Sequence, residues 1–408
     1  MPLDEELIAL RREIHRRPEL AGEERETAGL VAEHLRAAGL EVTTGVGGHG
    51  VVAVLDGSAD GPTVAYRADM DAVDATRNVL PFPRSGRVHD EGFASRVPGV
   101  AHLCGHDLHT AIGVGVARTL ARSSDQARGR LVFVFQPAEE PLRDARAMLD
   151  TGLVQELAPR EFYALHCSPY PTGTIAVSPG YGLPGLDQVR IVVPGARRRR
   201  PASRPGSRGS ARSGFRRTSP RTERTSTRCW TPTWPRTARN PCRSPRGPSR
   251  GPAGSRPSAS CCASGRRSGC RTYARVERLA AAAGGHVTFQ DAPFPALVNS
   301  PELSTAAGTY LSTTLGPESV LWARASWPYN CEDFALFLNE APGAQLYLGV
   351  ANTDAGIDGA PHSPEFAADE RAIGHGVRAT TGLLTHRLTA LERTGRPSPG
   401  RRKGADRP

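Results

Sequence analysis

Hydrophobic positions along this chain repeat at helical spacing in some segments and form short continuous runs in others. Leu7, Leu10 and Ile14 recur at intervals of three and four residues, and Pro18 separates them from a second helical pattern over 28–35. Strand-length apolar runs occupy 40–43, 51–55, 63–68, 131–135 and 161–166. This alternation predicts an α/β fold with a mostly parallel central sheet flanked by helices.

Polar side chains follow several of these predicted strands directly. Asp69 and Asp71 come after the run at 63–68. Glu139 and Glu140 follow the run at 131–135, and His166 ends the run at 161–166. The carboxyl ends of parallel strands meet at one edge of a sheet, where α/β proteins place their sites. We therefore expect these side chains to gather at that edge.

The globular pattern resumes after residue 272. It predicts helices over 276–283, 301–315, 332–338 and 372–391, with extended segments at 286–289 and 345–350. A helix is also expected over 109–121, directly after a cluster of His and Cys residues. The tail over 395–408 is rich in Pro, Gly and Arg and is predicted to be disordered.

The segment 197–271 shows neither the hydrophobic period of a helix (3.6 residues) nor that of a strand (2.0 residues). It contains no Leu, Ile, Val or Met, so it has little apolar surface to offset the conformational entropy that folding costs. It carries 21 Arg and one Glu, a formal charge of +20, whereas the whole chain carries +11 and the remainder therefore −9. We expect this segment to be disordered and to hold the basic charge of the protein.

Composition suggests an origin for this segment. Apart from Phe215, Glu223 and Asn240, every residue in it belongs to the eight types Arg, Pro, Ser, Gly, Ala, Thr, Cys and Trp, whose codons carry G or C in second position. A shifted frame in GC-rich DNA moves the GC-rich third position into the second. We hypothesise that 197–271 is read out of frame.

An Arg-rich arm is the alternative interpretation of the same segment. Such an arm would bind nucleic acid nonspecifically through its phosphates, with strong salt dependence. Phe215, Trp230 and Trp234 are the only aromatic residues that it offers for base stacking. Under this alternative the chain is a metal-binding protein without activity, and its disordered Arg-rich insert binds nucleic acid or acidic partners.

Length and the absence of a secretory pattern point to an intracellular protein. The length of 408 residues favours two domains. The first 17 residues contain Asp, Glu and Arg where a secretory signal has an apolar core, and no run is long enough to cross a membrane. We expect a cytoplasmic protein without a membrane partner, in which Cys104, Cys167 and Cys331 are reduced thiols or ligands.

The run AHLCGHDLHTA over 101–111 is the strongest chemical signal in the chain. It places His102, Cys104, His106, Asp107 and His109 within eight positions, around a Gly that permits a sharp turn. Thiolate, imidazole and carboxylate groups are the ligands that divalent transition metals favour. The sequence therefore predicts a metal centre, completed by ligands from the strand ends.

Six segments in this order resemble the aminoacylase/carboxypeptidase family of dinuclear metallohydrolases, in the branch of hippurate, N-acyl-amino-acid and auxin-conjugate hydrolases. IHRRPEL at 14–20 fits the same branch. The six segments are RADMDA (67–72), PGVAHLCGHDLHTA (ending at 111), FQPAEE (135–140), ALH (164–166), CEDF (331–334) and PHSPEF (361–366).

The resemblance implies a discontinuous catalytic domain interrupted by an α+β domain that forms a lid and a homodimer interface. The expected boundaries are 1–182 and 296–394 for the catalytic domain and 183–295 for the lid. In this chain the lid coincides with the anomalous segment, so a dimer is in doubt. Where the family has Gly-Gly-His, whose His stabilises the oxyanion, this chain has Gly195-Ala196-Arg197. We expect impaired turnover with retained metal binding, since loss of one oxyanion donor costs about 3 kcal/mol.

The resemblance also assigns roles to individual residues. Cys104 would bridge two divalent ions, which could be zinc, manganese, cobalt or nickel. Glu139 would be the general base, Asp71 would orient a ligand imidazole, and Asp69 would assist. The further metal ligands would be His106, Glu140, His166 and His362. The implied activity is hydrolysis of the amide bond of N-acyl amino acids or dipeptide-like substrates by a water that the ions activate.

Overall fold

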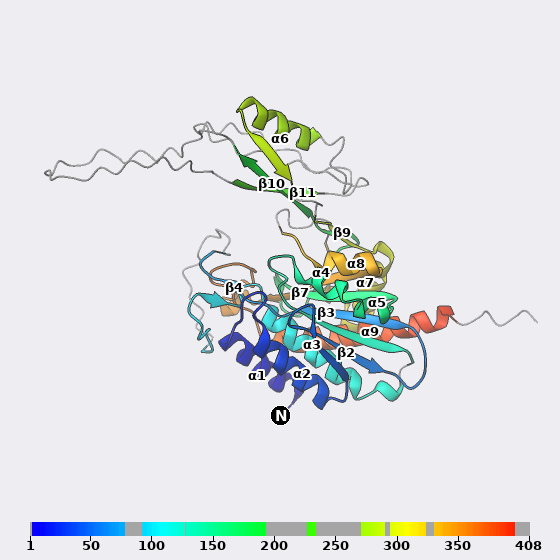
Figure 1. Cartoon of the computed structure of the whole chain (residues 1–408). Coiled ribbons are helices and arrows are strands. Elements are labelled where there is room, and N and C mark those ends of the chain that lie inside the picture. Colours follow the sequence, from blue (N-terminus) through cyan, green and yellow to red (C-terminus); the bar gives the residue numbers. More distant parts are fainter. Residues whose placement is uncertain are drawn as a thin grey trace, which may run out of the picture. The chain divides into compact units, whose positions relative to one another are not determined.

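A computed structural model describes residues 2–77, 92–126, 128–192, 227–233, 271–289, 294–323 and 330–395 (Figure 1). The chain divides into two compact units. The first comprises Met1–Leu183 with Leu297–Pro408, and the second comprises Pro184–Ala296. Among the described helices, none combines the length and apolar character that a membrane span requires.

An eight-stranded sheet in the order β1-β2-β6-β3-β7-β15-β8-β14 is the centre of the first unit. The neighbours β6, β3, β7 and β15 run parallel, and β2 is antiparallel to both β1 and β6. The predicted α/β fold with a mostly parallel sheet is confirmed. The strands are β1 (Glu41–Val46), β2 (Gly50–Asp56), β3 (Thr63–Asp69), β6 (Arg130–Gln136), β7 (Glu161–Pro171), β8 (Ile175–Val177), β14 (Val320–Trp322) and β15 (Gly343–Ala351).

Helices cover both faces of this sheet. They are α1 (Leu3–Arg16), α2 (Arg25–Ala37), α3 (His106–Ala121), α4 (Asp144–Asp150), α5 (Leu153–Glu156), α7 (Pro301–Leu315), α8 (Phe334–Glu340) and α9 (Arg371–Gly395). Short 3-10 turns lie at Ser124–Gln126, Pro317–Ser319 and Thr353–Ala355. Two small ribbons pair β4 (Val73–Asp74) with β5 (Val100–Ala101) and β9 (Gly180–Leu183) with β13 (Leu297–Asn299).

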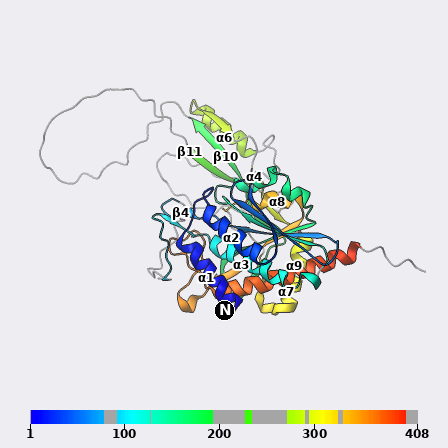
Figure 2. The same ribbon diagram turned by 60° about the horizontal axis from the view of Figure 1, so that its bottom comes forward.

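Successive side chains of a central strand point to opposite faces of the sheet, and both faces are buried. This explains why the central strands are continuous apolar runs. Tyr66 and Tyr163 belong to the large core that includes α1, α3 and α9, which lie together in Figure 2. Phe162 points to the opposite face, where its ring lies 5.0 Å from that of Phe337 and 5.6 Å from that of Phe334 on α8. Both faces of β7 are therefore buried, as is typical of parallel sheets.

The second unit contains a three-stranded antiparallel sheet. β10 (Gly185–Val192) lies between β11 (Thr227–Thr233) and β12 (His286–Phe289), and α6 (Arg271–Ala282) precedes β12. The segment 197–271 is predicted to be disordered, and the strand β11 within it shows that this prediction was wrong for residues 227–233. Main-chain pairing with β10 needs no apolar side chains. The rest of 197–270, and the tail after 395, lie outside the described residues.

Two helices at the predicted site begin elsewhere than predicted, and α6 begins at Arg271 rather than at residue 276. α3 begins at His106 rather than at residue 109, because Gly105 takes a left-handed conformation (φ +83°) and ends the preceding loop. α8 begins at Phe334 rather than at residue 332, and the Glu332 side chain accepts the Phe334 N–H at 3.0 Å. In both cases functional side chains occupy the turn before the helix.

Close approach of α1, α3 and α9 depends on Gly115. A Cβ at this position would lie 2.4 Å from Leu7 Cδ1 and 2.7 Å from Val377 Cγ2. We expect Gly115→Ala to lower the free energy of unfolding by about 1–3 kcal/mol, because overpacking strains the core. Gly29 on α2 is exposed and meets nothing within 4 Å, so Gly29→Ala is the matched control.

This control should raise the free energy of unfolding by about 0.5–1 kcal/mol through helix propensity. Urea unfolding followed by circular dichroism measures both variants. Equal effects of the two substitutions would contradict a tight crossing at Gly115.

Candidate metal centre

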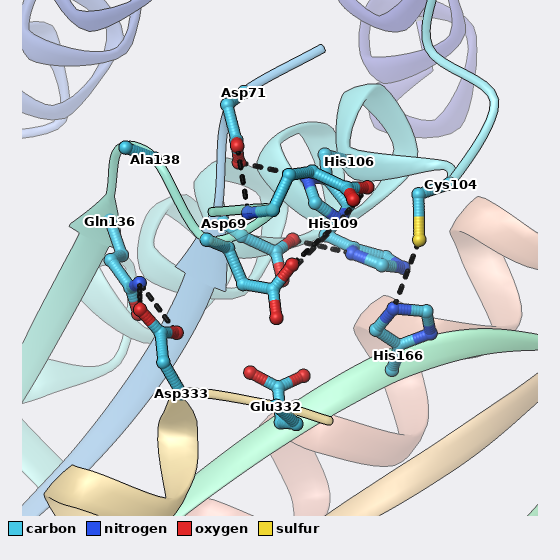
Figure 3. A network of polar contacts seen from close by, with 12 residues as sticks. Asp69, Asp71, Cys104, His106, His109, Gln136, Ala138, His166, Glu332 and Asp333 are labelled. Atoms are coloured by element: carbon cyan, nitrogen blue, oxygen red, sulfur yellow. Dashed lines mark hydrogen bonds and ion pairs between the residues drawn. The ribbon is translucent and has the colours of Figure 1, made fainter. Parts of the chain in front are cut away.

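The predicted site residues converge at the carboxyl edge of the central sheet (Figure 3). β3 ends at Asp69, β6 ends at Gln136 just before Glu139 and Glu140, and β7 carries His166. Register brings Asp69 opposite Gln136, so the two strand ends are level. His106 is the first residue of α3, and Cys104 lies two residues before it. His362 lies in the loop after β15.

Gly105 permits the turn that separates Cys104 from His106. Its φ of +83° disfavours residues with a side chain, and a Cβ there would lie 2.5 Å from the Cys167 sulfur. Cys104 and His106 are both buried. The glycine noted in the sequence is therefore required both by backbone conformation and by space.

Asp71 fixes the orientation of the His106 ring. Its Oδ1 lies 3.1 Å from His106 Nδ1, and its Oδ2 accepts the Glu140 backbone N–H at 3.0 Å. Against the effect of burial, the carboxylates of Asp69 and Asp71 raise the pKa of His106 to about 10, so Nε2 carries a proton that a metal ion would have to displace. Nε2 is buried without a hydrogen-bond partner and lies 4.0 Å from Glu139 Oε2 and 4.0 Å from Glu140 Oε1.

The His166 ring is also held through its Nδ1, in this case by a main-chain oxygen. Its Nδ1 donates to the Cys167 carbonyl at 2.7 Å, and its Nε2 lies 3.5 Å from Cys104 Sγ. Burial and the neighbouring His109 hold the pKa of His166 well below its usual value, so the ring is neutral. A neutral imidazole with a free Nε2 is the form that binds metals.

Glu140 and His362 form a further pair of donors. Glu140 Oε1 lies 3.3 Å from His362 Nε2. The His362 backbone has a left-handed φ of +58°, and its N–H donates to the Leu103 carbonyl at 2.7 Å. This contact joins the loop after β15 to the residue before Cys104.

His109 is not available as a ligand, although it belongs to the cluster noted in the sequence. Its Nε2 accepts the Cys167 backbone N–H at 2.7 Å, and its Nδ1 donates to Asp69 Oδ1 at 2.6 Å. Both ring nitrogens are therefore used inside the protein. His109 instead links Asp69 on β3 to the β7 strand that carries His166.

A buried arginine organises the carboxylates on the other side of the site. Arg67 NH1 donates to Asp69 at 2.6 Å, and its NH2 lies 3.1 Å from both Glu332 and Asp333. Gln136 accepts from Arg67 Nε at 2.8 Å and donates to Asp333 at 2.7 Å. The family resemblance gives no role to Arg67, Gln136, Glu332 and Asp333, although each lies in one of the segments that carry it.

Arg67 lies 69 positions from Gln136 and 266 positions from Asp333, so spacing along the chain could not connect them. The one available signal was the presence of a charged residue, Arg67, within an otherwise apolar strand. Such a residue is buried only when it is paired.

The electrostatics of the cluster fit a bound cation. Burial and the nearby Glu140, Cys167 and Glu139 raise the pKa of the Cys104 thiol well above its usual value. Burial and the carboxylates of Glu332, Asp333 and Glu140 raise the pKa of Glu139 in the same way. Positive charge placed among these groups would stabilise their ionised forms.

The donor distances agree with this interpretation. Two ligands of one tetrahedral zinc ion, each at about 2.0–2.3 Å from it, lie about 3.3–3.7 Å apart. The pair Cys104–His166 at 3.5 Å and the pair Glu140–His362 at 3.3 Å meet this spacing. Residues Cys104, His106 and Glu140 offer donor atoms within 4.8 Å of one another. By contrast, the group Glu139, Glu332 and Asp333 already contains the Arg67 guanidinium.

Comparison with known proteins gives consistent matches. The model of peptidase family M20/M25/M40 matches residues 65–386. Thermostable carboxypeptidase 1 of Saccharolobus solfataricus is 31% identical over 402 residues, covering 96% of both chains. Indole-3-acetyl-aspartic acid hydrolase of Enterobacter agglomerans is 45% identical over 127 residues, which cover 31% of this chain and 28% of that protein.

A solved structure supports the fold. A dinuclear metal binding peptidase from the M20 family of Bacillus subtilis superposes with a TM-score of 0.66 at 24% identity, covering 95% of this chain and 99% of that one. The matches favour a hydrolytic enzyme acting on amide bonds over a metal-binding protein without activity. The chain belongs to peptidase family M20/M25/M40.

Proposed function

We propose that this protein is a metal-dependent amidohydrolase that cleaves the amide bond of N-acyl amino acids or of dipeptide-like substrates. The observation that carries the proposal is a pair of buried histidines, His106 and His166, whose Nε2 atoms lie 3.5–4.0 Å from a thiol and two carboxylates. The relatives named as a carboxypeptidase and as an indole-3-acetyl-aspartic acid hydrolase act on such bonds.

We assign the metal ligands to Cys104, His106, Glu140, His166 and His362. When bound, a pair of divalent ions supplies Lewis acidity to a water nucleophile and to the amide carbonyl. Zinc, manganese, cobalt and nickel all suit a set of thiolate, imidazole and carboxylate donors. Asp71 holds the His106 ring and the Glu140 backbone in place through its two oxygens.

Glu139 is the proposed general base. Its carboxylate is buried, and burial together with the nearby carboxylates of Glu332 and Asp333 raises its pKa, which favours acceptance of a proton. Adjacent Glu139 and Glu140 thus divide the work, because one takes a proton from water while the other holds an ion. Glu139 would return this proton to the leaving amine.

The compartment, the oligomeric state and the rate of turnover stay predictions of the sequence. The sequence predicts a cytoplasmic protein, and the family resemblance implies a homodimer that the anomalous lid segment of this chain puts in doubt. The Gly195-Ala196-Arg197 segment lacks the histidine that the resemblance implies. We therefore expect slow hydrolysis with intact metal binding.

Substitution of the two adjacent glutamates separates their roles. Glu139→Gln should lower kcat by about 10²- to 10⁴-fold and leave the metal content unchanged, because it removes the base but no ligand. Glu140→Gln should lower the metal content as well as kcat. Elemental analysis of the purified variants, beside initial rates, tests this assignment. Full activity of Glu139→Gln would exclude Glu139 as the base.

Removal of the metal should abolish hydrolysis without unfolding the protein. After dialysis against EDTA we expect no activity and an unchanged far-ultraviolet circular dichroism spectrum. Zinc, manganese, cobalt and nickel, each added back alone, identify the ion that restores the rate. Activity that survives complete removal of metal would contradict the proposed chemistry.

The substrate class is tested with N-acetyl, N-benzoyl and indole-3-acetyl amino acids. Release of the free amino acid, measured by mass spectrometry, should be dependent on metal and on Glu139. A metal-loaded protein that hydrolyses none of these amides or simple dipeptides would support the alternative of an inactive homologue.

A further inference from the structure

Glu24 is a buried carboxylate whose partner lies far along the chain. It precedes α2 and its side chain does not cap that helix. The side chain is fully buried, and Oε1 accepts two backbone N–H groups, from Gly22 at 2.8 Å and from Ala138 at 2.8 Å. Ala138 is 114 positions away and immediately precedes the proposed base Glu139.

Ala138 has an unusual backbone conformation. Its φ of +45° lies in the left-handed region, which costs a residue with a Cβ about 1–2 kcal/mol. It is fully buried, at the turn between the end of β6 and Glu139 (Figure 3). Such strain persists only where surrounding contacts fix it, and it clusters at functional sites. The hydrogen bond from the Ala138 N–H to Glu24 is such a contact, beside the one that the Ala138 carbonyl accepts from the Arg143 N–H at 3.4 Å.

Glu19, in the same loop, accepts the N–H groups at the start of α2, so Glu24 is not needed to cap that helix. The Glu19 carboxylate accepts the backbone N–H groups of Glu26 at 2.9 Å and Thr27 at 2.8 Å, and also the Thr27 hydroxyl. Glu19 therefore satisfies the first turn of α2. Two acidic residues of one loop thus serve different elements, one its own helix and the other the turn at Ala138.

We propose that Glu24 is a positioning residue for the general base, and the inference rests on the proposed function. By accepting the Ala138 N–H, its carboxylate holds the left-handed turn from which Glu139 and Glu140 point to different partners. Without this contact the peptide is free to relax, and the Glu139 carboxylate loses its fixed place. The second oxygen, Oε2, is buried without a hydrogen-bond partner, so the Gly22 and Ala138 amides are the ones that orient the group.

Kinetics of three variants test the inference with N-benzoylglycine as substrate. Glu24→Ala should lower kcat by about 10- to 100-fold while KM and the metal content stay unchanged. Glu24→Gln keeps an acceptor oxygen and should restore most of kcat. The matched control Glu19→Ala should lower the melting temperature without lowering kcat.

A double-mutant cycle shows whether Glu24 acts through Glu139. In the Glu139→Gln background, Glu24→Ala should cause no further loss of kcat, because the base that it positions is already absent. An additional loss equal to that in the wild-type background would overturn the inference. A fall in KM or metal content in place of kcat would overturn it as well.

Hydrogen exchange provides a readout that does not need activity. The amide of Ala138 should exchange faster in Glu24→Ala than in the wild-type protein, and at the wild-type rate in Glu24→Gln and Glu19→Ala. If no amide is hydrolysed by the wild-type protein, the proposed function fails while this measurement still tests the contact. Unchanged exchange in Glu24→Ala would overturn the inference even in an active enzyme.

Discussion

The concentration of carboxylates at one edge of the central sheet is the constraint on which the site depends. Asp69, Asp71, Glu139, Glu332 and Asp333 are all buried, and burial of unpaired charge is strongly unfavourable. Arg67 compensates the part of the cluster on the side of α8, through contacts at 2.6–3.1 Å. The side that faces Cys104 and His106 instead presents thiol, imidazole and carboxylate donors, and there Asp69 and Asp71 raise the pKa of His106 to about 10 against the effect of burial. This asymmetry separates a self-contained half of the site from a half suited to metal.

Proton positions follow from this arrangement. Two of the three proposed histidine ligands direct Nδ1 to an oxygen, His106 to Asp71 and His166 to a main-chain carbonyl. His109 does the same but also accepts a main-chain N–H, which removes it from the set of ligands. Hydrogen bonding thus distinguishes three neighbouring imidazoles that residue type alone leaves equivalent.

The backbone bears strain where the functional groups leave the regular elements. Gly105, Ala138 and His362 all have positive φ, and each lies at or next to a residue of the site. Two of the three are not glycine, so surrounding contacts must hold them. The Glu24 hydrogen bond at Ala138 and the Leu103 carbonyl at His362 are such contacts. The precision of the site therefore depends on parts of the chain that never touch substrate.

The sequence by itself determined the α/β class, most of the strands and helices, and the family to which the chain belongs. These properties are carried by local periodicity and by short ordered segments such as 101–111. It could not determine where α3 and α8 begin, because Gly105 and Glu332 act there through conformation and hydrogen bonding. The strand at Thr227–Thr233 was also missed, since main-chain pairing leaves no apolar pattern. Only the tertiary structure decided the roles of His109, Arg67 and Glu24, because their partners come from segments far apart in sequence and are set by packing.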